Sequence, residues 1–456
     1  MTLNIKISSK KQEILTGSSN LSSNQKVNFD KHSYMLENME HNKAYKDQIN
    51  SKNESNKATI LSQYKKRYTS YRDNWHSQPK KIYEMGYENF NKIKKEILPL
   101  CVDIELAAIC DLACPHCFRE YILTPDKTMD EEFFIDIINQ VSDLKIPSIK
   151  LNWRGEPLLH PKISQFISYA KSKGILDIAI NTNATNLTEK KSKEIIESGL
   201  DQIIYSFDGG SKKTYEKMRP GRFKSNKFEE VYENIKNFKK VRDKLNTKFP
   251  VTKIQMILTN DSRNEVEDFY RLFSDYVDDV TVTQYNERGG NLEDINIDNK
   301  NFIKDYLSEN NLPIETPYIV DVDDNIFISK GRISCDQLFQ RMMITYDGQV
   351  GMCCHDWGAQ HCIGYLAPEA FKFDKTIDNL EAKVKDNKKG FELLRMAKKP
   401  TKFNVPKKEI SSLINIWMGE ELNKVRSNHF DSKNIDKVDI CKGCSFKDTY
   451  EWTKIK

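Results

Sequence analysis

The stretch LCVDIELAAICDLACPHC, residues 100–117, joins an apolar run to three cysteines that lie within eight positions. The run LCVDIEL has the aliphatic and β-branched residues that are typical of a buried strand. Cys110, Cys114 and Cys117 follow it closely, although the whole chain of 456 residues has only ten cysteines. The stretch therefore predicts a strand whose carboxyl end carries a cluster of thiols.

Length and composition predict a globular protein of about two or three domains. The opening MTLNIKISSKKQEILTGSSN lacks the apolar segment of a secretory signal, and the most apolar stretch, residues 97–110, contains Pro99, Asp103 and Glu105. We therefore expect a cytoplasmic protein that does not span a membrane. In that reducing compartment, clustered cysteines indicate metal or redox sites rather than disulfides.

Charge argues against a nucleic-acid partner. The net charge of +5 is the difference between 71 basic and 66 acidic residues, and the two kinds are interspersed along the chain. A dedicated nucleic-acid surface would gather the basic residues into a patch.

Outward from the cysteines, short β-rich runs alternate with amphipathic helical segments. The six strand candidates begin at residues 100, 148, 176, 201, 252 and 278. After the first, Thr128 and Glu131 are spaced as a capping box for a helix over EEFFIDIINQVSDL. Such alternation predicts an α/β fold, a partial (β/α)6 TIM-like barrel, whose chemistry collects at the carboxyl ends of its parallel strands.

Composition divides the chain into three parts. Residues 1–95 are an N-terminal extension, which we expect to be a polar, mobile tail to about residue 57 and helical afterwards. Residues 96–290 hold the β/α alternation. Residues 291–456 break it and contain six of the ten cysteines, which predicts a smaller second domain, with a charged insertion at about 367–415.

The spacing CxxxCxxC limits what the first cluster can bind. Three thiolates on a short loop can hold three irons of a 4Fe-4S cube and leave the fourth iron open, because full protein ligation takes four cysteines. A zinc site needs a fourth ligand, and the local candidate His116 would bind with strain between two of the cysteines. Three unrelated buried thiols are the remaining alternative.

The motif CDLACPHC, placed after the first strand of a six-unit β/α domain, resembles the signature of the radical S-adenosylmethionine (SAM) enzymes. The resemblance implies that SAM chelates the open iron through its amine and carboxylate. One electron from a flavodoxin- or ferredoxin-type donor then breaks the carbon–sulfur bond, and a 5'-deoxyadenosyl radical takes a hydrogen atom from a substrate.

Later strand ends carry motifs that are similar to those of the family. WRGEPLLHP at 153–161 resembles its GGEP segment, which implies that Gly155 and Glu156 contact the amino group of SAM, with Arg154 where the first glycine usually stands. The resemblance implies further SAM contacts in NTNAT, in SFDGG and its following helix, and before the last cysteine. These residues are Asn181, Asn183, Ser206, Arg219 and, beside the adenine, His116.

The second domain resembles the twitch domain, the shortened form of the SPASM domain. The resemblance implies one auxiliary 4Fe-4S cluster on Cys335, Cys353, Cys441 and Cys444. Cys354 is the alternative to Cys353, but the sequence spacing from the preceding glycine favours Cys353. A zinc knuckle on these cysteines is the other possibility, since such thiolate sites bind either metal.

An auxiliary cluster with four protein ligands is suited to electron transfer, so the prediction is a radical SAM oxidoreductase. It would dehydrogenate a small polar substrate, a sugar or cyclitol, with Asp356 or His355 as the base by position only. A peptide-modifying maturase is the first alternative, although residues 1–95 show no strand pattern of a peptide-recognition domain. A non-catalytic zinc-binding interaction protein is the second.

Overall fold

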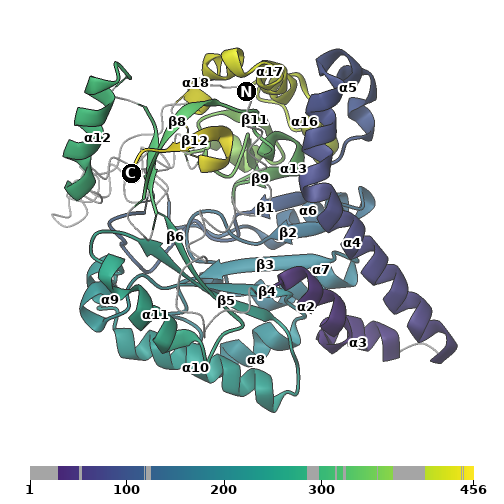
Figure 1. The fold of residues 1–456 in the computed structure, drawn as a ribbon. Coiled ribbons are helices and arrows are strands. Elements are labelled where there is room, and N and C mark those ends of the chain that lie inside the picture. Colours follow the sequence, from purple (N-terminus) through teal and green to yellow (C-terminus); the bar gives the residue numbers. More distant parts are fainter. Residues whose placement is uncertain are drawn as a thin grey trace.

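The computed structural model describes residues 29–50, 54–117, 119, 125–284, 297–313, 316–321, 325–356, 358–372, 406–442, 444 and 446–456. A parallel sheet lies at the centre, with helices on its outer side (Figure 1). Residues 1–28 of the expected tail and residues 373–405 of the expected insertion lie outside the described residues. Within the described part of the chain, no helix is long and apolar enough to cross a bilayer.

The six strands that the sequence predicts are present and parallel, and they lie side by side in sequence order. They are β1 (Cys101–Ile104), β2 (Ser148–Lys150), β3 (Asp177–Thr182), β4 (Gln202–Ser206), β5 (Val251–Leu258) and β6 (Asp279–Gln284). Val102, Ile149 and Ile178 are partners in register and form one buried layer across three strands. This burial explains the apolar runs and confirms the α/β prediction.

Helices between the strands cover the outer face of the sheet. They are α6 (Glu131–Asp143), α7 (Ile163–Ser172), α8 (Glu189–Glu197), α9 (Lys212–Met218), α10 (Phe228–Lys244) and α11 (Val266–Phe273). The predicted capping box at the start of α6 is wrong. Asp130 is the cap, because it stands directly before the first turn and its carboxylate accepts the N–H groups of Glu132 and Phe133.

The C-terminal part of the chain extends the same sheet. β9 (Arg341–Ile344) pairs in parallel with β1, and β10 (Gln349–Gly351) and β11 (Cys362–Tyr365) continue outward from it in antiparallel pairing. A separate antiparallel sheet consists of β7 (Tyr318–Val320), β8 (Ile326–Arg332) and β12 (Tyr450–Lys454). The helices here are α12 (Ile297–Glu309), α13 (Gln337–Gln340), α16 (Leu413–Trp417), α17 (Glu420–His429) and α18 (Asp439–Lys442).

The N-terminal helices are α2 (Lys31–Asn38), α3 (Lys43–Asn50), α4 (Glu54–Met85) and α5 (Tyr87–Ile93). They pack on the end of the barrel where the strands begin, except for α5, whose Phe90 packs against Phe339 and Phe430. The structure differs here from the expectation of a mobile tail to about residue 57. Met35, Met39 and Tyr45 are buried against Leu100 and Phe249, so a few apolar anchors suffice to fix this polar segment.

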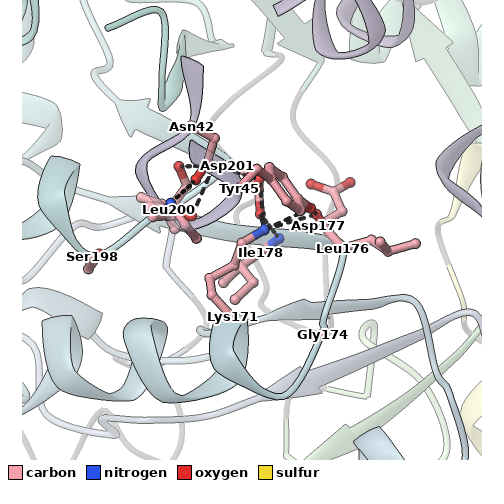
Figure 2. A network of polar contacts seen from close by, with 12 residues as sticks. Asn42, Tyr45, Lys171, Gly174, Leu176, Asp177, Ile178, Ser198, Leu200 and Asp201 are labelled. Atoms are coloured by element: carbon pink, nitrogen blue, oxygen red, sulfur yellow. Dashed lines mark hydrogen bonds and ion pairs between the residues drawn. The ribbon is translucent and has the colours of Figure 1, made fainter. Parts of the chain in front are cut away.

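A buried polar network joins α3 to the barrel (Figure 2). The Lys171 ammonium lies 2.8 Å from one carboxylate oxygen of Asp201 and donates to the Tyr45 hydroxyl at 3.0 Å. The Asn42 amide donates to the other Asp201 oxygen at 2.9 Å, and the Ile178 backbone N–H also donates to this carboxylate. The network closes the amino ends of β3 and β4.

Candidate active site

The loop between β1 and α6 carries the cysteine cluster, and a second loop packs tightly under it. Gly155, just after β2, has a φ of +66°, and a Cβ atom built there would lie 2.1 Å from the carbonyl oxygen of Ala107. The N–H of Glu156 donates to the carbonyl of Ile109 at 2.8 Å. Only glycine allows this approach of the two backbones, so Gly155 sets the position of the cysteine loop.

The three cysteines line one cavity of about 510 Å³ at the carboxyl ends of the strands. Burial raises the pKa of Cys110 to about 12 and that of Cys114 well above its usual range. A bound cation would reverse this preference for the thiol form, because metal coordination deprotonates a thiol. Among the described residues, no group of three His, Cys, Asp or Glu side chains is arranged to hold a single metal ion.

The other residues that the family resemblance implied lie at the same cavity. The lining includes all seven: His116, Gly155, Glu156, Asn181, Asn183, Ser206 and Arg219. Three of them hold buried polar atoms without a hydrogen bond, namely His116 Nδ1, Asn181 Oδ1 and Arg219 Nε. Buried polar groups are nearly always bonded, so these atoms fit a polar ligand in the cavity.

Asp208 organises His116 and Arg219. Its role was not predicted, although it lies inside the SFDGG motif. Its carboxylate lies 2.6 Å from Arg219 Nη2 and 3.1 Å from His116 Nε2, and it accepts the N–H of Ile257 at 2.7 Å. Burial acts to raise the pKa of Asp208, but Arg219 and His116 outweigh burial and hold it below the usual value. The fully buried carboxylate therefore orients both partners toward the cavity.

The Glu156 carboxylate is hydrogen-bonded to residues at the end of β3. It accepts the N–H of Asn183 and the Thr182 hydroxyl, both at 2.7 Å, and the N–H of Leu158 at 3.0 Å. Burial raises the pKa of Glu156 to about 7, against the effect of these donors. The side chain thus positions the NTNAT segment as well as facing the cavity.

Asp111, between two of the cysteines, ties the cysteine loop to the same segment. Its carboxylate accepts from the Asn183 amide at 2.8 Å and from the Thr185 hydroxyl at 2.6 Å. The role of Asp111 was not predicted, since nothing local in the sequence marks a contact between residues 72 positions apart.

Arg154 stands where the resembling motif has a glycine, but its side chain does not fill the cavity. Its guanidinium turns away and forms a bidentate pair with Glu105, at 2.6 and 2.9 Å. The same Glu105 carboxylate accepts the N–H of Tyr346 at 3.2 Å. The buried pair therefore fixes the loop after β2 to the ends of β1 and β9.

The four cysteines of the second cluster are close enough to act on one another electrostatically. Burial raises the pKa of Cys335 and of Cys353. Charge on Cys444 and Cys441 raises both further, and for Cys353 the neighbouring Cys354 and Asp356 contribute more than these two. Cys354, the alternative ligand, lines the cavity instead and lies 3.4 Å from Gln337 Oε1. Charge on Cys354 also raises the pKa of Cys444, so this placement does not separate Cys353 from Cys354 as the fourth member.

The two candidate bases differ in position. Asp356 is fully buried, and its oxygens accept the N–H groups of Gln360 and His361, each at 2.8 Å. It is absent from the lining of the cavity, so the structure does not bring it to the other site residues. His355 lines the cavity and packs on Phe446, with ring centroids 4.3 Å apart.

Comparisons with known proteins point to one family. The model of the radical SAM superfamily matches residues 104–273. A probable GTP 3',8-cyclase of Methanothermobacter marburgensis is 36% identical over 112 residues, which are 25% of this chain and 36% of that protein. The tungsten-containing aldehyde ferredoxin oxidoreductase cofactor-modifying protein of Pyrococcus furiosus is 31% identical over 108 residues, 23% of this chain and 30% of that one. The match spans about a third of each relative.

Two solved structures align with this chain at low identity. BtrN in complex with AdoMet and 2-DOIA is 15% identical, has a TM-score of 0.41, and is aligned over 77% of this chain and 95% of its own. Streptococcus suis SuiB bound to the precursor peptide SuiA is 15% identical, with a TM-score of 0.46 and 74% and 69% coverage.

Proposed function

Residues 104–273 form a radical SAM domain, and we propose that the protein is a radical SAM oxidoreductase that dehydrogenates a sugar, cyclitol or similar small polar molecule. The observation that carries the proposal is the meeting of Cys110, Cys114 and Cys117 with seven predicted SAM contacts at one cavity. A 4Fe-4S cluster on these thiols would supply the electron that cleaves SAM to a 5'-deoxyadenosyl radical.

The residues of the cavity then have distinct roles. Gly155 lets the backbone approach the bound amino acid part of SAM, and the Glu156 carboxylate supplies negative charge for its ammonium group. Asp208 holds His116 and Arg219 in place, which leaves His116 Nδ1 and Arg219 Nε for the nucleoside.

We propose that Cys335, Cys353, Cys441 and Cys444 hold one auxiliary 4Fe-4S cluster that accepts the second electron of the dehydrogenation. After the hydrogen atom leaves the substrate carbon, a base takes the hydroxyl proton and one electron remains to be removed. His355 is favoured over Asp356 as that base, because it lines the cavity and Asp356 does not.

The far side of the cavity supports a polar substrate. Asp103 and Arg341 line it as an ion pair at 3.1 Å, together with Lys150, Gln255 and Thr283. The similarity to GTP 3',8-cyclases does not extend the proposal to nucleotides, since it covers about a third of those proteins. For the peptide-maturase alternative, the described part of residues 29–96 contains helices and no strand.

The test is deuterium transfer. The enzyme, reconstituted without oxygen, is incubated with SAM, a reductant and sugars or cyclitols deuterated at their carbinol carbons. We expect deuterium in 5'-deoxyadenosine and a ketone product from at least one of them. Mass loss in a precursor peptide instead would replace this substrate class, and a colourless preparation that contains only zinc would remove the radical chemistry.

A further inference from the structure

His429, the last residue of α17, lies buried beside the second cysteine cluster, and nothing in the proposed reaction uses it. His429 is only 1% exposed to solvent. Nε2 of the ring lies 3.4 Å from the sulfur of Cys441, and Nδ1 accepts the backbone N–H of Cys335 at 3.3 Å. The imidazole thus bridges two of the four cysteines.

These two contacts fix the tautomer of the ring. A backbone amide can only donate, so Nδ1 must present its lone pair to Cys335. A neutral imidazole with an unprotonated Nδ1 carries its proton on Nε2. The N–H that results points at the Cys441 sulfur, which is the acceptor.

The surroundings hold the ring in this orientation. The Ser334 hydroxyl donates to the carbonyl of His429 at 2.5 Å, which anchors the end of α17 to the residue before Cys335. Arg332 donates to the carbonyls of Cys441 and Cys444, so the backbone that carries these two sulfurs is held independently of the imidazole. Removing the ring should therefore remove the N–H···S contact and the acceptor for Cys335 N–H, while Arg332 still holds the loop of Cys441 and Cys444.

We propose that His429 is a positioning residue that donates its Nε2–H to the Cys441 thiolate and raises the reduction potential of the auxiliary cluster. Reduction adds negative charge to the cluster and its sulfurs, so a donor to sulfur stabilises the reduced state more than the oxidised state. The effect favours uptake of an electron from the substrate. The inference rests on the auxiliary cluster of the proposed function.

The experiment uses the variant C110A/C114A/C117A, in which the auxiliary cluster is the only one expected. Its midpoint potential is measured by EPR-monitored redox titration with His429, H429Q and H429L. Gln keeps an amide N–H near the place of Nε2–H, whereas Leu fills the space without a donor. We expect a more negative potential for H429L and a potential close to that of the parent for H429Q.

Equal potentials for H429L and the parent would overturn the inference, and so would equal shifts in H429L and H429Q, which indicate a packing effect. The parent should also show a pulsed-EPR coupling to nitrogen when its histidines carry ¹⁵N, and H429Q should lose it. Absence of that coupling contradicts the hydrogen bond even where H429L assembles no cluster. A parent without iron overturns the auxiliary cluster itself, and with it the role of His429.

Discussion

The two ends of the barrel bury similar polar side chains for different purposes. At the carboxyl ends of the strands, His116, Asn181 and Arg219 each keep a buried polar atom without a hydrogen bond. At the amino ends, Lys171 and Asp201 are equally buried, but the Lys171 ammonium and both Asp201 oxygens have partners (Figure 2). Unbonded buried atoms also occur at the amino ends, as at the Tyr68 hydroxyl, so it is the cavity beside His116, Asn181 and Arg219 that marks a ligand site.

The comparison teaches how to separate a site from a structural network. Charge and burial do not distinguish the two ends, whereas the cavity at the carboxyl ends does. We therefore expect substitutions at the carboxyl ends, the open end, to affect chemistry more than stability, and substitutions at the amino ends, the closed end, to do the reverse.

The largest effect is expected for Cys114→Ala at the open end. The change removes one of three thiols, so 5'-deoxyadenosine production from SAM and dithionite should fall below detection by chromatography. Cys101→Ala is the matched control, because Cys101 is also buried but lies in β1 and is absent from the cavity lining. Full activity of Cys114→Ala, or an equal loss of activity in Cys101→Ala, would contradict the assignment of the reactive site to the cysteines at the cavity.

Gly155→Ala should lower the same activity by about 10- to 100-fold, because the new methyl group would collide with the Ala107 carbonyl and displace the cysteine loop. Gly86→Ala is the control. Gly86 also has a positive φ, +80°, but no atom lies within 4 Å of the added Cβ. Similar losses in both variants would mean that backbone strain, and not the contact with the cysteine loop, is responsible.

Lys171→Met at the closed end should destabilise the fold by about 3 to 5 kcal/mol, because it leaves the Asp201 carboxylate buried without its cation. SAM cleavage by the protein that remains folded should be unchanged. Urea denaturation measures the loss, with Lys162→Met as control, since its pair with Glu131 is about half exposed and worth at most about 1 kcal/mol. A stability loss no larger than that of the control would contradict the closed-end assignment.

The smallest expected effect is a pH dependence from Glu156. Burial raises the pKa of Glu156 to about 7, so the folded protein holds a proton that the unfolded chain releases near its usual value of 4.5. Stability from this group is present below that value and is lost as pH rises through about 7, by about 1 to 3 kcal/mol.

Urea denaturation between pH 4 and pH 8 measures this contribution, and Glu156→Gln should abolish it. The control is Glu132→Gln on the exposed surface of α6, which should leave the wild-type profile intact. A profile that Glu156→Gln does not change would show that the carboxylate is ionised throughout this range.

The sequence predicted what local patterns encode. Continuous apolar runs revealed the six strands, and the cysteine spacing revealed the site at the end of β1. It could not predict contacts between distant segments: the pairing of β9 with β1, the link from Asp111 to Asn183, or the docking of Asn42 and Tyr45. Those depend on the folded arrangement, which neither local propensity nor charge pattern records.

For the same reason, position along the chain could not decide between Asp356 and His355 as the base. The two residues are adjacent in sequence, yet one carboxylate satisfies loop amides while the neighbouring ring lines the cavity. The direction in which each side chain leaves the loop decides which residue reaches the cavity, and a motif of two adjacent polar residues does not encode that direction.

The central claim is that a cluster on Cys110, Cys114 and Cys117 has one open corner that SAM occupies. The most direct measurement is electron–nuclear double resonance on the reduced enzyme with SAM that carries ¹⁵N in its amino group. The account predicts a nitrogen coupling that disappears in Cys114→Ala. A reduced cluster whose spectrum is unchanged by SAM and shows no such coupling would contradict it.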